Sequence, residues 1–184
     1  MLNQPLGYLS DLKIDWKNYE PFLNKIAAPA KSRLLNEGDI SDKIFIIQSG
    51  SVRLGYFQDE KDITFQFFFE NELFTSVESF FCDKPSRFFI ETVEPVNAFY
   101  LTKNMLAQLI EKKPEMHEIS QQIMLNGLVF YSSQLLSYMQ DTPQKRYNNL
   151  INTRPYIFMR VPQRHIASYL GITDVSLSRI KSRR

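Results

Sequence analysis

The spacing of apolar positions changes along the chain and predicts different structures for different regions. In residues 6–28 apolar side chains recur at roughly helical spacing, which predicts a helix that Pro21 breaks or restarts. Residues 31–101 contain short β-rich runs separated by turn residues, with Gly38 and Gly50 suited to a positive φ. The predicted strands are Arg33–Leu35, Lys43–Gln48, Ser51–Gln58, Asp62–Phe69, Phe88–Val93 and Ala98–Leu101. Many short strands indicate an antiparallel barrel or sandwich.

Residues 104–140 follow a helical period and carry an unusually wide apolar face. One stripe on this face contains Met116, Ile119, Ile123 and Phe130, and the adjacent stripe contains Met124, Leu128, Tyr131, Leu135 and Tyr138. A face this wide favours two partners, namely the β-rich region of the same chain and the same helix of a second subunit. The alternative is a helix buried wholly within one subunit.

The last part of the chain begins at Asp141-Thr142-Pro143, which predicts a turn or hinge. A helix over Gln144–Asn152 and a short strand over Tyr156–Val161 are expected next. The segment Gln163–Arg184 then predicts two short helices.

These two helices have their own local signals. Ile166, Ala167 and Leu170 form one apolar side of the first helix, and Gly171 can end that helix in a left-handed conformation. Thr173 can cap the second helix, Asp174 suits its positive end, and Leu177 and Ile180 give it a buried side. Two short helices joined by a glycine-containing turn predict a helix-turn-helix, whose second helix enters the major groove of DNA.

The charge of the chain is divided unevenly. Residues 143–184 contain nine Lys and Arg and one acid, a net charge of +8, whereas residues 1–142 contain thirteen Lys and Arg and nineteen acids, a net charge of −6. A basic end on an acidic body indicates that this end meets a polyanion such as nucleic acid. The alternative is a solvated basic tail.

Composition excludes several classes of protein. The chain has 184 residues, no apolar run long enough for a membrane span and no secretory signal at its start, and its one cysteine, Cys82, cannot form an internal disulfide. We therefore expect a cytoplasmic protein without cofactor. No Gly-rich phosphate loop, G-x-S-x-G or HExxH motif occurs, so we do not expect an enzyme.

The pattern I-A-x-x-L-G-I-T-x-x-x-L-S-R-I within Gln163–Arg184 resembles the helix-turn-helix of CRP/FNR transcription regulators. Upstream, LLNEGDISDKIFIIQSGSVRLGYF is similar to the opening strands of a cyclic-nucleotide-binding β-roll. The resemblance implies an α+β fold with an antiparallel, jelly-roll-like β-roll. It implies three parts: a β-roll domain with an N-terminal helix over 1–102, a dimerisation helix over 103–142, and a helix-turn-helix domain over 143–184 with little or no wing.

The helix-turn-helix supplies candidate DNA contacts. Arg179 would face the groove, where its fork can donate two hydrogen bonds to guanine, although a phosphate contact or a surface ion pair is the alternative. Val175 could pack against a thymine methyl group. Further phosphate or base contacts are expected from Gln163, Arg164, Thr173, Asp174, Ser176, Ser178, Lys181, Arg183 and Arg184. Well-known family members carry Arg-Glu where this chain has Asp174-Val175, so we expect a different operator.

The segment NELFTSVESFFCDKPSRFFIETVE occupies the place of the family's phosphate-binding cassette. In ligand-binding members a Gly-Glu pair takes the ribose, and an Arg followed by small residues takes the cyclic phosphate. Here Thr75-Ser76 replaces Gly-Glu, Arg87 is retained, and Phe88-Phe89 replaces the small residues. Nine of the fifteen Phe residues lie between Phe65 and Phe89. We therefore expect an apolar or filled cavity and no cyclic AMP binding. Arg87 could bind another anion or pair with Glu78.

Other effectors of the family can be weighed in the same way. Iron–sulfur sensing needs several cysteines, whereas Cys82 stands alone in a predicted loop, where it is a thiol sensor or an unreactive thiol. His117 and His165 are expected to be structural or exposed rather than haem ligands. The predicted function is a homodimeric DNA-binding regulator with an unknown small-molecule effector, able to contact RNA polymerase. The alternative is a small-molecule-binding β-roll with a degenerate helix-turn-helix that acts through protein contacts.

Overall fold

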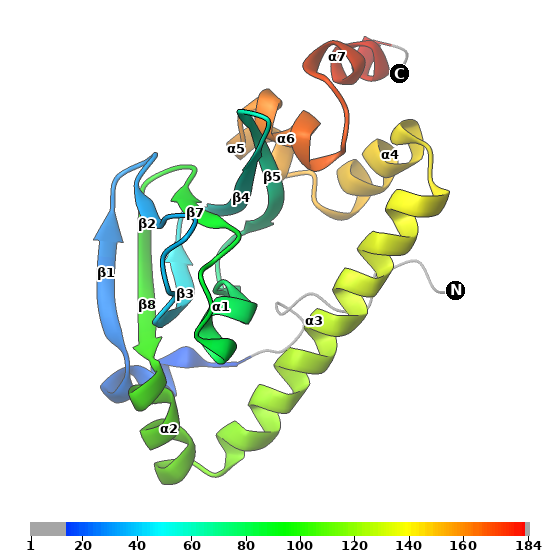
Figure 1. Cartoon of the computed structure of the whole chain (residues 1–184). Coiled ribbons are helices and arrows are strands. Elements are labelled where there is room, and N and C mark those ends of the chain that lie inside the picture. The colour runs from blue at the N-terminus through cyan, green and yellow to red at the C-terminus, as the bar shows by residue number, and fades with distance from the viewer. Residues whose placement is uncertain (1–13, 183–184) are drawn as a thin grey trace.

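The computed structural model describes residues 14–182, and it contains a β-roll, one long helix and a group of short helices (Figure 1). The roll has two four-stranded sheets, ordered β1-β8-β3-β6 and β2-β7-β4-β5, in which neighbouring strands are antiparallel. The strands are β1 (Asn24–Ala28), β2 (Arg33–Leu35), β3 (Lys43–Ser49), β4 (Val52–Gln58), β5 (Lys61–Phe68), β6 (Leu73–Phe74), β7 (Phe89–Thr92) and β8 (Val96–Thr102).

The six strands expected from the sequence are confirmed within two residues at each end. Inward-facing side chains of both sheets fill the roll, and they include Phe45, Val52, Leu54, Phe74 and Ile90. β3 and β4 are buried in continuous runs rather than at alternate positions, so the β-rich composition and the turn residues between the runs were sufficient to find these strands.

The amino-terminal part differs from the helix expected over residues 6–28. A 3-10 helix, η2 (Trp16–Phe22), contains Pro21, and the next residues form strand β1, which pairs with β8. The helical spacing was misleading because the apolar residues that follow it are divided between two elements. Trp16 and Tyr19 lie in the 3-10 helix, whereas Ile26 lies in the edge strand β1. The part of the expected helix before residue 14 lies outside the described residues.

Two short elements were not expected from the sequence. Strand β6 has only two residues, and helix α1 (Val77–Cys82) has six. Cys82 is therefore the exposed last residue of a helix and does not lie in a loop. Asp83 follows in a left-handed conformation with φ 55°, and its backbone N–H donates to the Ser79 carbonyl, which ends the helix.

The helical region after the roll is divided in two. Helix α2 (Lys103–Lys112) ends before Pro114, and helix α3 (Glu115–Gln140) continues from there along the open side of the roll (Figure 1). Proline cannot donate the backbone hydrogen bond that a continuous helix would need, and its ring crowds the preceding turn. The turn expected at Asp141–Pro143 is confirmed: α3 ends at Gln140, and Thr142 caps α4 (Pro143–Thr153) by accepting from Lys145 N at 3.3 Å. No helix among residues 14–182 is long and apolar enough to cross a membrane.

Three short helices follow α4: α5 (Ile157–Arg160), α6 (Gln163–Tyr169) and α7 (Asp174–Ser182). The strand expected over Tyr156–Val161 is therefore wrong. Ile157 and Val161 are both buried, and their spacing of four residues places them on one face of a helical turn. The segment does not pair with any described strand.

The terminal helices pack against the second sheet of the roll. Phe67 on β5 contacts Tyr169 on α6, with ring centroids 5.3 Å apart, and Phe69 contacts Tyr156 at 4.8 Å. The Thr64 backbone N–H donates to Ser168 Oγ at 2.8 Å. Both faces of β5 are therefore covered, one by the roll interior and the other by α6.

Two arginines and three glutamates complete this junction, and we call them the arginine clasp: Arg154, Arg160, Glu70, Glu72 and Glu94. Arg154 Nη2 donates to Glu72 Oε1 at 2.8 Å, and these residues are 2% and 5% exposed. Arg160 donates two hydrogen bonds to the Glu70 carboxylate, from Nη1 at 2.8 Å and from Nη2 at 2.7 Å. Its Nε donates to Glu94 Oε1 at 3.0 Å. The bonds from Arg160 lower the pKa of Glu70 to about 2.

Replacing Arg154 by methionine should strongly destabilise the protein, because Glu72 would remain buried beside an apolar chain. A broken buried pair costs about 3–5 kcal/mol of unfolding free energy, which urea denaturation would measure. The double variant Arg154→Met with Glu72→Leu should recover most of that loss, since neither charge then remains in the interior. Equal stability of Arg154→Met and the unmodified protein would contradict this account of the clasp.

Candidate nucleic-acid interface and effector site

The turn between α6 and α7 has the geometry that its sequence predicted. Gly171 has φ +68°, and Thr173 Oγ1 accepts from Ser176 N at 3.2 Å, which caps α7. Leu177 is fully buried against Ile166 and Ala167, which are each 1% exposed. A small residue at position 167 lets the two helices approach closely, and this packing fixes how α7 is presented.

The outer face of α7 is directed away from the core that Leu177 enters. Val175, Ser178 and Arg179 are exposed, as are Asp174 and Thr173. Ser176 is half-buried, since its side chain lies beside the cap. An exposed row on a short capped helix is the arrangement by which a recognition helix presents side chains to base edges.

The start of α6 extends this surface. Gln163 Nε2 donates to Ser178 Oγ at 3.3 Å, and Lys181 Nζ donates to Gln163 Oε1 at 3.2 Å. The structure thus brings together Gln163, Ser178 and Lys181, whereas Arg183 and Arg184 lie outside the described residues. Arg164 and Arg179 are exposed on α6 and α7 and form no hydrogen bond with these three residues. The exposed cations of the two helices produce a positive field around α7.

His165 lies directly behind this surface and is buried. Burial is the main reason that its pKa falls to about 4, and the positive charge of Arg53 adds to the effect. Arg53 is itself buried on β4, where Asp62 and Glu91 accept its hydrogen bonds at 2.5 to 2.8 Å. The expectation that His165 is structural agrees with this position.

The expected effector site looks different from a phosphate cradle. The Arg87 side chain is 78% exposed, and its Nε lies 3.4 Å from Glu78 Oε2. Of the two expected roles of Arg87, the structure therefore has the ion pair with Glu78. Thr75 and Ser76 are buried and already hydrogen-bonded within the protein. Thr75 Oγ1 donates to the Lys43 carbonyl at 2.8 Å, and Ser76 Oγ accepts from Ser86 at 2.8 Å.

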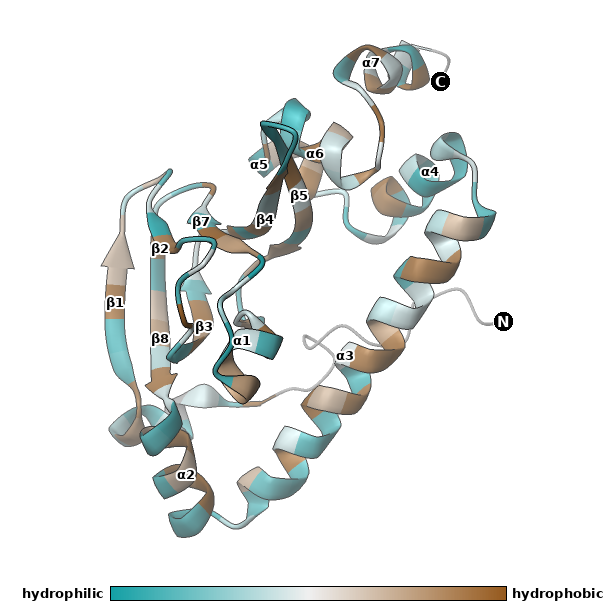
Figure 2. Ribbon diagram, viewed as in Figure 1, coloured by the Kyte–Doolittle hydropathy of each residue, from teal (hydrophilic) through white to brown (hydrophobic). Residues whose placement is uncertain are grey.

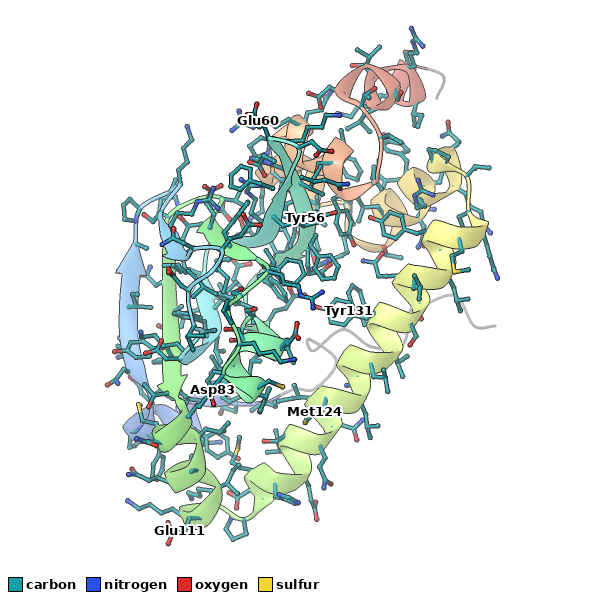
Figure 3. All side chains as sticks on the ribbon, viewed as in Figure 1. Tyr56, Glu60, Asp83, Glu111, Met124 and Tyr131 are labelled. Carbon is teal, nitrogen blue, oxygen red and sulfur yellow. The ribbon has the colours of Figure 1, made fainter. Side chains whose placement is uncertain are left out.

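Aromatic rings occupy the space between the cassette and α3. Phe88 contacts Phe65 with centroids 4.9 Å apart and Tyr56 at 6.1 Å. Phe65 stacks on Tyr131 of α3 at 5.7 Å with an interplanar angle of 22°. Figure 3 shows Tyr131 projecting from α3 toward the roll. We call these four residues, Tyr56, Phe65, Phe88 and Tyr131, the aromatic column; it links β4, β5 and the cassette to α3.

A β-bulge aligns the column. Along β4 and β5, Leu54 pairs with Gln66 but Gly55 pairs with Thr64, so Phe65 is the extra residue. The bulge leaves Phe65 partly exposed between Gln66 and Thr64, which are both buried. The density of phenylalanines is visible in the sequence, but the special position of Phe65 is not, because a bulge depends on the pairing register and not on local sequence.

Helix α3 presents a second apolar face that the chain itself does not cover. Leu125, Leu128, Leu135, Leu136 and Met139 are each more than half exposed, and Leu128 is 65% exposed. Brown segments recur along this helix in Figure 2. The other face, which includes Met116 and Phe130, is buried. A helix buried wholly within one subunit therefore does not describe α3.

Comparison with known proteins identifies part of the chain. Residues 25–113 match the family model of the cyclic nucleotide-binding domain. These residues include all of the roll from Lys25 onward and helix α2. This part of the chain is therefore similar to the cyclic nucleotide-binding domain, as expected from the resemblance. No curated protein sequence matches the chain.

Solved structures extend the likeness to the remaining helices. A CooA mutant from Carboxydothermus hydrogenoformans has 14% identity and a TM-score of 0.71, covering 94% of this chain and 80% of the other. FixK2 from Bradyrhizobium japonicum has 13% identity and a TM-score of 0.70, covering 88% and 83%. The c-di-GMP-responsive regulator CLP from Xanthomonas campestris has 14% identity and a TM-score of 0.69, covering 91% and 88%. The fold is that of CRP/FNR regulators, which confirms the expected fold class.

Acid should weaken the fold through His165. Because the folded pKa of about 4 lies below the ordinary 6.5, the unfolded chain binds the proton first, so stability is lost as the pH falls from 6.5 to 4. Allowing for solvent screening, the loss amounts to about 2 kcal/mol. Denaturation of the unmodified protein and of His165→Gln at each pH would isolate this contribution. Parallel curves for the two proteins would show that His165 does not cause it.

Proposed function

We propose that the protein is a sequence-specific DNA-binding transcription regulator that acts as a homodimer. The observation that carries this proposal is the exposed outer face of α7, where Arg179 and Val175 project from a capped helix beside Arg164 and Lys181. A protruding helix of this kind fits the major groove, and the adjacent cations suit phosphates. The fold shared with DNA-regulating proteins supports the same function.

The apolar face of α3 supports the homodimer. Leu125, Leu128, Leu135 and Met139 are each more than half exposed, and with the exposed Ser132 they follow alternating intervals of three and four residues, the spacing of a coiled-coil seam. A two-fold axis along this seam would bury side chains that are exposed in one subunit. Two recognition helices would then meet successive major grooves about 34 Å apart, so the operator should be roughly palindromic.

The effector of this regulator is proposed to be a small molecule other than a cyclic nucleotide. Arg87 forms an ion pair with Glu78 on the surface, and the hydroxyl groups of Thr75 and Ser76 are engaged within the protein. Phe88 takes the place of a small residue and packs into the aromatic column. A cyclic phosphate at this position would have to displace Phe88 and Phe65 before it met a cation, which costs buried aromatic contact.

Replacing Arg179 by alanine should lower the affinity for the selected DNA site by about ten- to a hundredfold, because one bidentate base contact contributes about 1–3 kcal/mol. The site would first be selected from random DNA with the unmodified protein, and fluorescence anisotropy would measure affinity. Arg87→Ala is the matched control, since it removes an exposed arginine far from α7. If the unmodified protein binds no DNA at low salt, the alternative β-roll module acting through protein contacts would be favoured.

Replacing Leu128 by glutamate should dissociate the homodimer, because the charge would be buried in the seam. Light scattering after size-exclusion chromatography should give the mass of two chains for the unmodified protein and of one chain for the variant. Met159→Glu is the control, since Met159 is 81% exposed on α5, away from α3. A dimer that survives Leu128→Glu unchanged would place the subunit interface elsewhere.

A further inference from the structure

The basic end of the chain carries a single acidic side chain, and it lies on the helix that would meet DNA. Asp174 is the only Asp or Glu in residues 143–184, which contain nine Lys and Arg. It is the first residue of α7, and it is exposed next to the row formed by Val175 and Arg179. The first turn of a recognition helix is the part that reaches base edges in the major groove. The carboxylate of Asp174 is therefore within the part of α7 that would read bases.

A carboxylate at this place is by itself unfavourable for DNA binding. The phosphates of DNA repel it, and no Lys or Arg among residues 14–182 forms an ion pair with Asp174. The cap of α7 does not depend on it either, because Thr173 Oγ1 already accepts from Ser176 N. A negative charge at the positive end of α7 stabilises the helix slightly, which is the alternative role. On DNA, the charge is compensated only where a base donates a hydrogen bond to it.

The bases differ in what they offer to a carboxylate in the major groove. Cytosine presents its N4 amino group, which is a donor. Guanine presents the two acceptors N7 and O6, and thymine presents the acceptor O4 and a methyl group, so neither can donate. Adenine presents the N6 donor beside the N7 acceptor, which repels one carboxylate oxygen. A carboxylate in the groove therefore selects cytosine over the other three bases.

We infer that Asp174 is a specificity-determining residue that accepts a hydrogen bond from the N4 amino group of one cytosine in each half of the operator. This role rests on the proposed function, which it makes specific to one base. Repulsion between Asp174 and the phosphates weakens binding to every sequence, and the cytosine contact offsets this loss at the operator alone. Asp174 thus increases the difference in affinity between the operator and other DNA, whereas the cations around α7 act on phosphates of any sequence.

The contact can be tested on the unmodified protein with a modified base. The preferred site is first selected from random DNA, and each cytosine of one half-site is then replaced in turn by N4-methylcytosine. This base still pairs with guanine, but a methyl group takes the place of the groove-facing hydrogen. At one cytosine the affinity measured by fluorescence anisotropy should fall about tenfold or more, the effect of losing one hydrogen bond to a charged group. Equal affinity for all the methylated sites would overturn the inference.

Two variants assign the effect to Asp174. In Asp174→Ala the methyl group at that cytosine should no longer lower the affinity, because no acceptor remains. In Asp174→Asn the preference at the same position should change from cytosine to adenine by about tenfold, because an amide can bind N6 and N7 of adenine together. Asp42→Asn is the matched control, since it removes an exposed carboxylate that lies on the roll just before β3. The control should keep the preference for cytosine.

The same measurements separate base reading from a structural role. If Asp174 only stabilises α7, Asp174→Asn would lower the melting temperature and leave the preferred base unchanged at every position, and this result would overturn the inference. The methylated sites still decide the question if neither variant folds. A protein that selects no site from random DNA would contradict the regulator function itself. A protein that selects a site, but reads it equally well without the Asp174 carboxylate, would contradict the role of Asp174 alone.

Discussion

The position of the DNA-reading unit depends on the arginine clasp. Arg154 and Arg160 reach from the end of α4 and from α5 to glutamates at one end of the roll, and Arg154 and Glu72 are almost fully buried. A buried ion pair tolerates little change in geometry, because either charge alone would be strongly destabilising there. The clasp therefore fixes α6, and through it α7, relative to the two sheets.

The other side of the molecule is less constrained. Helix α3 leaves the roll after Pro114 and ends at the hinge before α4, and its exposed leucines have no cover within the chain. The aromatic column lies between this helix and the roll and supplies ring contacts that join them.

Elements that depend on contacts between neighbouring residues could be predicted from the sequence. Gly171, Thr173 and Leu177 each act on neighbouring residues, so the helix-turn-helix could be predicted from local sequence. The pairing of Arg154 with Glu72, 82 positions apart, depends on the finished fold and leaves no local trace. The same is true of the bulge at Phe65, which arises from the pairing register of β4 and β5. A strand was wrongly predicted over Tyr156–Val161 because Ile157 and Val161, four residues apart, fit the spacing of a strand as well as that of a helical turn.

Strand β5 has a consequence for how the protein can be divided. Phe68 enters the roll while Phe67 and Phe69 pack under Tyr169 and Tyr156. A fragment that ends at residue 142 would expose Phe67 and Phe69 to solvent as an apolar surface. Glu72 would also lose its ion pair with Arg154 in such a fragment. Helices that follow the roll in the chain thus cover part of its apolar surface. The hydrophobic core is continuous across the break between α3 and α4.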